Sequence, residues 1–250
     1  MSSYQQQTRV PRRTKSKRLP LIQIGSIIAA SAIFGYLIGN YRQRKTFPIK
    51  STNNNGKHSV ITTNNKGRQR ILLFGDSTTW GYCPDTQKRL QTRYGNILQE
   101  LLGDGYDIIQ EGLNGRTIMF NDIDSDKNKR RGLNMNSVEQ ILPIIYSHKP
   151  IDIVVIMLGI NDCKAKFNAT CKSITTNMKI LIEKVKNAEI WAFYRPKILL
   201  ISPAMMGECN DINSEWGFDI NSQRISKGLS IEYQKLADIY ECVDFMNAND

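Results

Sequence analysis

Three short stretches of the sequence place polar side chains and glycine directly after apolar runs. The first is 75–78 (GDST), the second is 111–117 (EGLNGRT) and the third is 159–162 (GIND). A serine hydroxyl in such a position can act as a nucleophile when a base assists it. Backbone N–H groups and an asparagine amide can bind the oxyanion that forms during acyl transfer. The residue types in these stretches therefore indicate acyl-transfer chemistry, provided that the fold brings them together.

The elements around these stretches predict that they meet. From Arg70 onward, short apolar runs alternate with helical patterns, which indicates an α/β fold with a parallel sheet covered by helices on both faces. Five strands are expected, at 71–74, 106–110, 151–158, 197–202 and 242–245. Helices are expected around 93–102, 138–145, 174–185 and 225–239. Ligands bind at the carboxyl ends of the strands in such sheets, and the three stretches follow three of these ends.

Each of the three stretches contains one candidate site residue. Ser77 would supply the nucleophile and a backbone N–H, Gly115 a second backbone N–H, and Asn161 a side-chain NH₂. Taken singly, each stretch also has a structural explanation. Such sequences are frequent in turns, and glycine permits backbone conformations that other residues rarely adopt. Their order and their positions after strands favour the catalytic interpretation.

The sequence resembles the SGNH/GDSL hydrolases, and within them the arylesterase-like branch. The matching stretches are 71–82 (ILLFGDSTTWGY), 111–117 (EGLNGRT), 147–168 (SHKPIDIVVIMLGINDCKAKFN) and 196–203 (PKILLISP). The resemblance implies a flavodoxin-like three-layer α/β/α fold, no metal or organic cofactor, and a small acyl-ester substrate. It assigns the nucleophile to Ser77, the backbone donor to Gly115 and the side-chain donor to Asn161, with an acyl-serine intermediate.

The general base is the part of this machinery that the sequence does not supply. The resemblance implies an Asp-x-x-His motif after the fifth strand, but the only histidines are His58 and His148, and neither belongs to such a motif. His148 precedes the strand 151–158, whose length at about 3.3 Å per residue places it roughly 26 Å from the carboxyl edge. We expect a structural role for His148, and His58 lies in a stretch too poorly fixed to position a base.

The absent motif leaves three functions open. In the first, the hydrolase domain at 70–250 is C-terminally incomplete and belongs to a serine esterase acting on short-chain acyl esters. In the second, the chain is a non-catalytic pseudo-esterase that binds acylated sugars or lipids. In the third, it is a tethered transacylase that prefers alcohols to water. Without a closing helix after the last strand, one face of the sheet there is expected to be uncovered and apolar.

The amino-terminal part of the chain has a different composition from the rest. No Asp or Glu precedes Asp76, and fourteen of the 34 Lys and Arg residues lie in 1–75. The remainder holds twenty basic and 23 acidic residues, so the net charge of +11 resides in this leader. The folded domain is therefore not expected to bind nucleic acid.

An uncharged apolar stretch from Leu19 to Gly39 lies within this leader. As a helix it would span about 31 Å, close to the thickness of about 30 Å of a bilayer's hydrocarbon core. We expect a basic tail at 1–18, a transmembrane helix at 19–41 and a flexible linker at 42–69. The slight excess of positive charge before the stretch favours an N-terminus inside and a luminal or extracellular domain. A cleaved signal peptide and a mitochondrial targeting segment are the alternatives.

The five cysteines form neither a CxxC pair nor a zinc-binding spacing. A disulfide between Cys163 and Cys171 and glycosylation at Asn168, which begins an Asn-x-Thr sequon, would suit an oxidising compartment. Unpaired, buried thiols and a chance sequon are the simpler interpretation.

Overall fold

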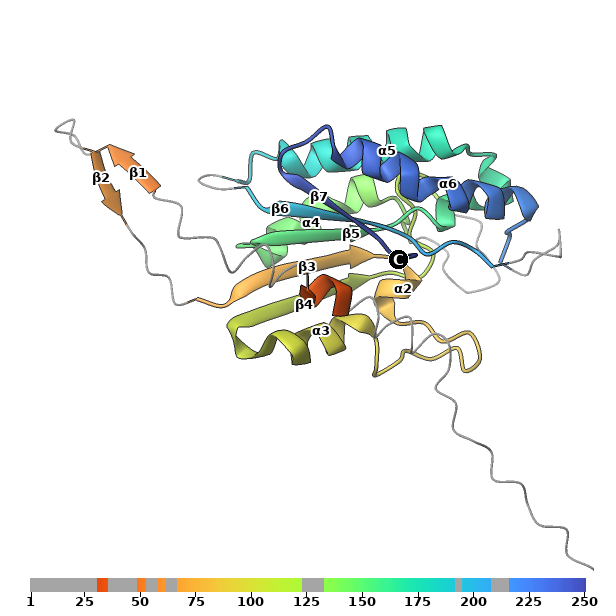
Figure 1. The fold of residues 1–250 in the computed structure, drawn as a ribbon, viewed down its shortest axis with the longest axis horizontal. Helices are drawn as coiled ribbons and strands as arrows, with labels where there is room; N and C mark the ends of the chain where they lie inside the picture. The colour runs from red at the N-terminus through yellow and green to blue at the C-terminus, as the bar shows by residue number, and fades with distance from the viewer. Residues whose placement is uncertain are drawn as a thin grey trace, which may run out of the picture.

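The described part of the chain is an α/β domain built on one parallel sheet (Figure 1). The computed structural model describes residues 31–35, 49–52, 58–61, 67–122, 133–191, 195–207 and 216–250. The strands of the sheet are β3 (Gln69–Gly75), β4 (Tyr106–Gly112), β5 (Ile153–Met157), β6 (Lys197–Ser202) and β7 (Val243–Asn247). They are arranged in the order β4-β3-β5-β6-β7, which is the flavodoxin-like order. The α/β fold with a five-stranded parallel sheet, expected from the sequence, is confirmed.

Helices lie on both faces of this sheet. Within the described residues, the four longest are α3 (Tyr94–Leu102), α4 (Ser137–His148), α5 (Cys171–Lys186) and α6 (Ile220–Ala237). Successive residues of β3 alternate between the faces, so Leu72 packs with α4, α5 and α6, whereas Leu73 packs with α3. Because both faces are covered, β5 is buried at every position, as its β-branched sequence predicts.

The short elements at the carboxyl edge complete the domain. They are α2 (Ser77–Trp80) after β3 and the one-turn helices η3 (Asn161–Cys163) and η4 (Ala165–Phe167). A further one-turn helix, η1 (Gly103–Gly105), joins α3 to the start of β4 at the opposite edge. Asn136 caps α4 by accepting the N–H of Val138 at 2.9 Å, as its position before the helical pattern predicts. Capping boxes begin α5 and α6.

Two further strands lie in the segment that we expected to be a linker. They are β1 (Ile49–Thr52) and β2 (His58–Ile61), and they pair antiparallel with each other. The sequence analysis did not predict them. The other residues between 42 and 66 lie outside the described residues, and the flexibility of the linker stays a prediction.

The predicted transmembrane helix is described only at residues 31–35, which are helical. Ile33 is 0% exposed and packs in the hydrophobic cluster beside α3. Among the described residues, no helix combines the length and the hydropathy needed to cross a membrane. The predicted basic tail and the rest of the predicted span, 19–30 and 36–41, lie outside the described residues.

Cys163 and Cys171 are both free thiols. The disulfide considered from the sequence is therefore not formed. The Cys163 thiol instead donates to the carbonyl oxygen of Gly159 at 3.4 Å, and burial raises its pKa to about 12. Asn168 is exposed, and its glycosylation stays a prediction.

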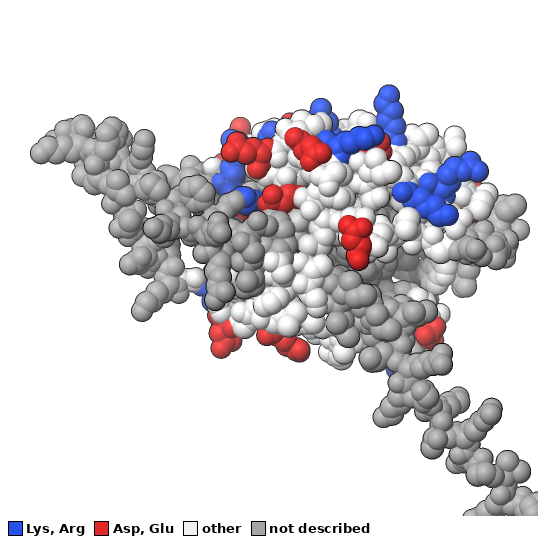
Figure 2. All heavy atoms as spheres, viewed as in Figure 1, with Lys and Arg blue, Asp and Glu red and all other residues white. Residues whose placement is uncertain are grey.

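Acidic and basic side chains both occur on the face of the domain seen in Figure 2. They gather along the upper edge, where α5 and α6 lie in the same view of Figure 1. The sequence of α5 ends with Lys184 and Lys186, which complement the negative end of its helix dipole. These two lysines therefore stabilise the carboxyl end of α5.

Candidate active site

Ser77 lies in the turn between β3 and α2. Asp76 caps α2, because its carboxylate accepts the N–H of Thr78 at 2.9 Å. The turn needs glycine at position 75, since a Cβ there would lie 2.0 Å from Oγ1 of Thr79. The strand and the capped helix thus fix both the hydroxyl and the backbone N–H of Ser77 at the carboxyl edge of the sheet.

Two cavities meet at Ser77. The first, which we call the aromatic cavity, has a volume of about 620 Å³. Its lining includes Gly115 and Asn161 together with four aromatic side chains, Trp80, Tyr82, Trp216 and Phe218. The second, which we call the apolar cavity, has a volume of about 710 Å³. Its lining includes Ala32, Tyr94, Met157, Ile201 and Met246. A bound ester could therefore extend in two directions from the serine.

The two predicted oxyanion donors lie on loops that are tied to the serine turn. The N–H of Leu113 donates to the carbonyl of Gly75 at 3.1 Å, which holds the second loop against the first. Gly115 has a φ of 85°, in the left-handed region that glycine tolerates and other residues rarely adopt. Asn161 is 6% exposed. The structure thus brings Ser77, Gly115 and Asn161 to the wall of one cavity, as the sequence predicted.

The Asn161 amide joins the three loops. One N–H donates to the carbonyl of Arg116 at 3.1 Å. The other faces Oδ2 of Asp76 at 3.5 Å, at the upper limit for a hydrogen bond. Because this second contact is long, protein groups hold that N–H only weakly.

Arg116 is a site residue that the sequence analysis did not identify. Its side chain is buried, and its guanidinium donates to the carbonyls of Gly75 (2.8 Å) and Glu111. It also lies over the ring of Phe74, 4.2 Å from the centroid. Burial lowers the pKa of Arg116 to about 10, so it is charged at neutral pH. The only sequence signal was its place beside Gly115, which does not show that a charge is buried there.

Asp162 is a second buried residue that the sequence analysis gave no role. It is 0% exposed, and each of its carboxyl oxygens lies 3.0 Å from the N–H of Ile118. Burial, together with the neighbouring Asp76 carboxylate, raises the pKa of Asp162 to about 8. Burial also raises the pKa of Asp76 to about 6. Asp162 therefore connects the second and third loops largely in its protonated form at neutral pH.

These raised pKa values predict that stability falls as the pH rises. An unfolded carboxyl titrates near about 3.9, so between pH 4 and 8 folded Asp162 keeps a proton that the unfolded chain has lost. We expect the free energy of unfolding to fall by about 2 kcal/mol between pH 5 and pH 7, and Asp162→Asn to remove most of this slope. Urea unfolding of the wild type and of Asp162→Asn, at several pH values between 5 and 7, measures the free energy of unfolding. Parallel slopes would rule out Asp162 as the cause.

His148 pairs with the second stretch from outside both cavities. The Nε2 of His148 is 2.8 Å from Oε1 of Glu111, and His148 lines neither cavity, which agrees with the structural role expected for it. Glu111 lies near the carboxyl end of β4. The imidazole of His148 is therefore closer to the carboxyl edge of the sheet than the length of the strand predicted. The side chains of His148 and Glu111 are both long, and together they span the distance between α4 and the end of β4. His58 is the first residue of β2. No histidine whose side chain is described lines either cavity.

One lysine borders the aromatic cavity. Lys164 is nearly buried, and its Nζ lies 2.9 Å from Oδ2 of Asp122. Lys166 pairs with the same carboxylate. The described residues contain no group of three or more His, Cys, Asp or Glu side chains placed to hold a metal ion.

Comparisons with known proteins agree with this site. The model of the GDSL-like lipase/acylhydrolase family matches residues 73–241. A carbohydrate acetylesterase family member from Sinorhizobium meliloti is 30% identical with a TM-score of 0.64, over 72% of this chain and 82% of that chain. The native aryl esterase of M. smegmatis is 29% identical with a TM-score of 0.62, over 72% of this chain and 83% of that chain. None of the curated proteins matches the chain.

The family match begins inside β3 and ends just before β7, so it contains all three loops that form the site. It spans more than half of the chain. Solved structures that resemble the chain include a carbohydrate acetylesterase family member and an aryl esterase. The chain therefore belongs to the GDSL-like lipase/acylhydrolase family, the SGNH type of carboxylic ester hydrolase.

Proposed function

We propose that this protein is a serine esterase that hydrolyses short-chain acyl esters through an acyl-serine intermediate at Ser77. The observation that carries this proposal is that Ser77, Gly115 and Asn161 line one cavity at the carboxyl edge of the sheet. A nucleophile and oxyanion donors within reach of one bound carbonyl are what acyl transfer requires.

The proposed reaction has two steps. The Oγ of Ser77 attacks the carbonyl carbon, and its proton passes to a water molecule, because no histidine with a described side chain lines either cavity. The N–H groups of Ser77 and Gly115 and the NH₂ of Asn161 stabilise the negative oxygen of the tetrahedral intermediate. The ester C–O bond then breaks, the alcohol leaves with a proton, and the acyl group stays on Ser77. Water attacks this acyl-serine and releases the carboxylic acid.

The aromatic cavity favours a ring-bearing alcohol as the leaving group. Tyr82 meets Trp216 edge to face, with ring centroids 6.0 Å apart, and Trp80 lies 6.4 Å from Tyr82. Flat aromatic surfaces of this kind stack against aryl and sugar rings. The names of the similar structures, an aryl esterase and a carbohydrate acetylesterase, support the same choice.

The test is covalent labelling of the full chain with a fluorophosphonate probe, followed by peptide mapping. We expect the label on Ser77 and its complete loss in Ser77→Ala. Ser147→Ala, which changes an exposed serine at the end of α4, is the matched control and should label as the wild type does. Release of p-nitrophenol from p-nitrophenyl acetate by the same three proteins measures turnover. Equal labelling and turnover in Ser77→Ala would refute the proposal.

A second function is favoured by the absence of a histidine from the cavity walls within the described residues. Without such a base the serine hydroxyl is a weak nucleophile, and the same cavities would serve to bind an acylated sugar or lipid. This alternative predicts that acetylated sugars bind, as measured by calorimetry, while Ser77 stays unlabelled. Rapid labelling of Ser77 would exclude it.

A further inference from the structure

The face of the sheet that carries α3 is only partly covered by that helix. Figure 1 shows α3 beneath β3 and β4, whereas α4, α5 and α6 lie on the other face, over the full width of the sheet. Apolar side chains of the central and far strands also point to the α3 face, namely Val155, Met157, Leu199 and Ile201. They need a cover, because an apolar sheet face of this width is unfavourable in water.

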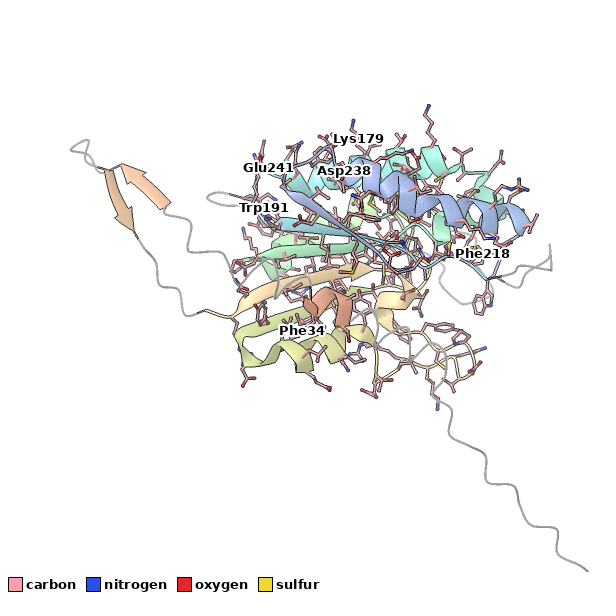
Figure 3. All side chains as sticks on the ribbon, viewed as in Figure 1. Phe34, Lys179, Trp191, Phe218, Asp238 and Glu241 are labelled. Carbon is pink, nitrogen blue, oxygen red and sulfur yellow. The ribbon has the colours of Figure 1, made fainter. Side chains whose placement is uncertain are left out.

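Residues 31–35 provide part of this cover. Ile33 is fully buried in the cluster formed by β3, α3 and the central strands, and Phe34 packs against the same cluster. Figure 3 places Phe34 between this short helix and α3. Ser31 and Gly35 are exposed, so the helix presents one side to the sheet and the other to water. Of the helices in the described residues, only this one and α3 contribute side chains to that cluster.

The same short helix reaches the candidate active site. Ala32 lines the apolar cavity together with Ser77, Tyr94 and Met157. The apolar stretch that suggested a membrane span therefore contributes to the wall of a cavity beside the serine. A side chain cannot lie in the core of the domain and among lipid chains at the same time.

We propose that residues 31–35 are an integral part of the hydrolase domain: they cover the α3 face of the sheet, form one wall of the apolar cavity, and lie outside any membrane-spanning segment. The occupant of the open face is thus the chain's own amino-terminal stretch. The proposal depends on packing alone and stands whether or not Ser77 is catalytic.

The first experiment measures the accessibility of two engineered thiols in the full chain mixed with lipid vesicles. A water-soluble maleimide is added, and peptide mapping separates the new thiols from the native cysteines. We expect Ser31→Cys to react as an exposed thiol and Ile33→Cys to react at least about tenfold more slowly until denaturant is added. Protection of both thiols by the vesicles would show insertion into the bilayer, and rapid reaction of both would show an undocked segment. Either result would overturn the proposal.

The second experiment measures how far residues 31–35 stabilise the domain and shield the apolar face of the sheet from water. Ile33→Asp places a charge in the apolar cluster, so we expect Tm to fall by about 5 °C or more and fluorescence of the dye ANS to rise as the face becomes exposed. Ser31→Asp, two residues away on the exposed side, should leave both values unchanged. If Ile33→Asp matches Ser31→Asp in both measurements, the helix does not cover the sheet. If Ile33→Asp cannot be purified folded, the thiol experiment decides.

Discussion

Arg116→Ala is expected to lower the free energy of unfolding by about 3–5 kcal/mol. The side chain is 3% exposed, and three acceptors would lose a donor: the carbonyls of Gly75 and Glu111, and Oε1 of Gln140 at 3.0 Å. The Gly75 carbonyl would keep the N–H of Leu113, but the contact to the Glu111 carbonyl would be lost, and lost contacts of buried polar groups are costly. The space under the Phe74 ring would add a cavity. Loss of the Arg116 side chain should also disturb Gly115, since Arg116 holds the second loop against the first.

Arg89→Ala is the matched control for this substitution. Arg89 also donates to a backbone carbonyl, that of Trp80 at 2.7 Å, and lies over an aromatic ring at 5.4 Å, but it is exposed. Exposed contacts of this kind contribute little, so we expect a change below about 1 kcal/mol. Urea unfolding at pH 7 measures both variants. If Arg116→Ala cost no more than Arg89→Ala, burial of the guanidinium would not contribute to stability.

Asn161→Ala is expected to slow the acylation of Ser77 by about 10²–10³-fold. The substitution leaves Ser77, the proposed nucleophile, in place and removes the side-chain NH₂ of Asn161, a proposed oxyanion donor from the wall of the aromatic cavity. An oxyanion donor acts mainly in the transition state, so the rate should fall far more than ligand binding weakens. The loss of the bond to the Arg116 carbonyl should lower stability by only about 1 kcal/mol.

The rate of fluorophosphonate labelling measures this effect, and thermal unfolding checks that the variant is folded. Asn221→Ala, which changes an exposed asparagine on α6, should label at the wild-type rate. An Asn161→Ala protein that is folded and labels as fast as the wild type would remove Asn161 from the oxyanion site. Equal slowing of labelling and ligand binding would indicate a role in binding only.

Both predictions concern one connected structure. Arg116 holds the first and second loops through backbone carbonyls, and Asn161 and Asp162 hold the second and third. Each loop follows a different strand, so a change in one should move donors that belong to the others. This arrangement explains why buried polar residues are retained at a place where apolar packing would be simpler.

The sequence by itself determined the sheet, the order of its helices and strands, and the three loops that form the candidate site. Those features depend on local patterns: alternation of short apolar runs and helical periods, and glycine with polar residues after a strand. Parallel strands carry their carboxyl ends to one edge, which is why Ser77, Gly115 and Asn161 could be expected to meet.

Only the tertiary structure decided the burial of Arg116, the pairing of His148 with Glu111, the free thiol of Cys163 and the docking of Ile33. Glu111 and His148 are 37 positions apart, whereas the docking of Ile33 depends on what covers a surface. Hydropathy reports that a stretch avoids water, but a bilayer and a protein core satisfy it equally. For this reason the 31–35 segment suggested a membrane span in the sequence and lies against the sheet in the structure.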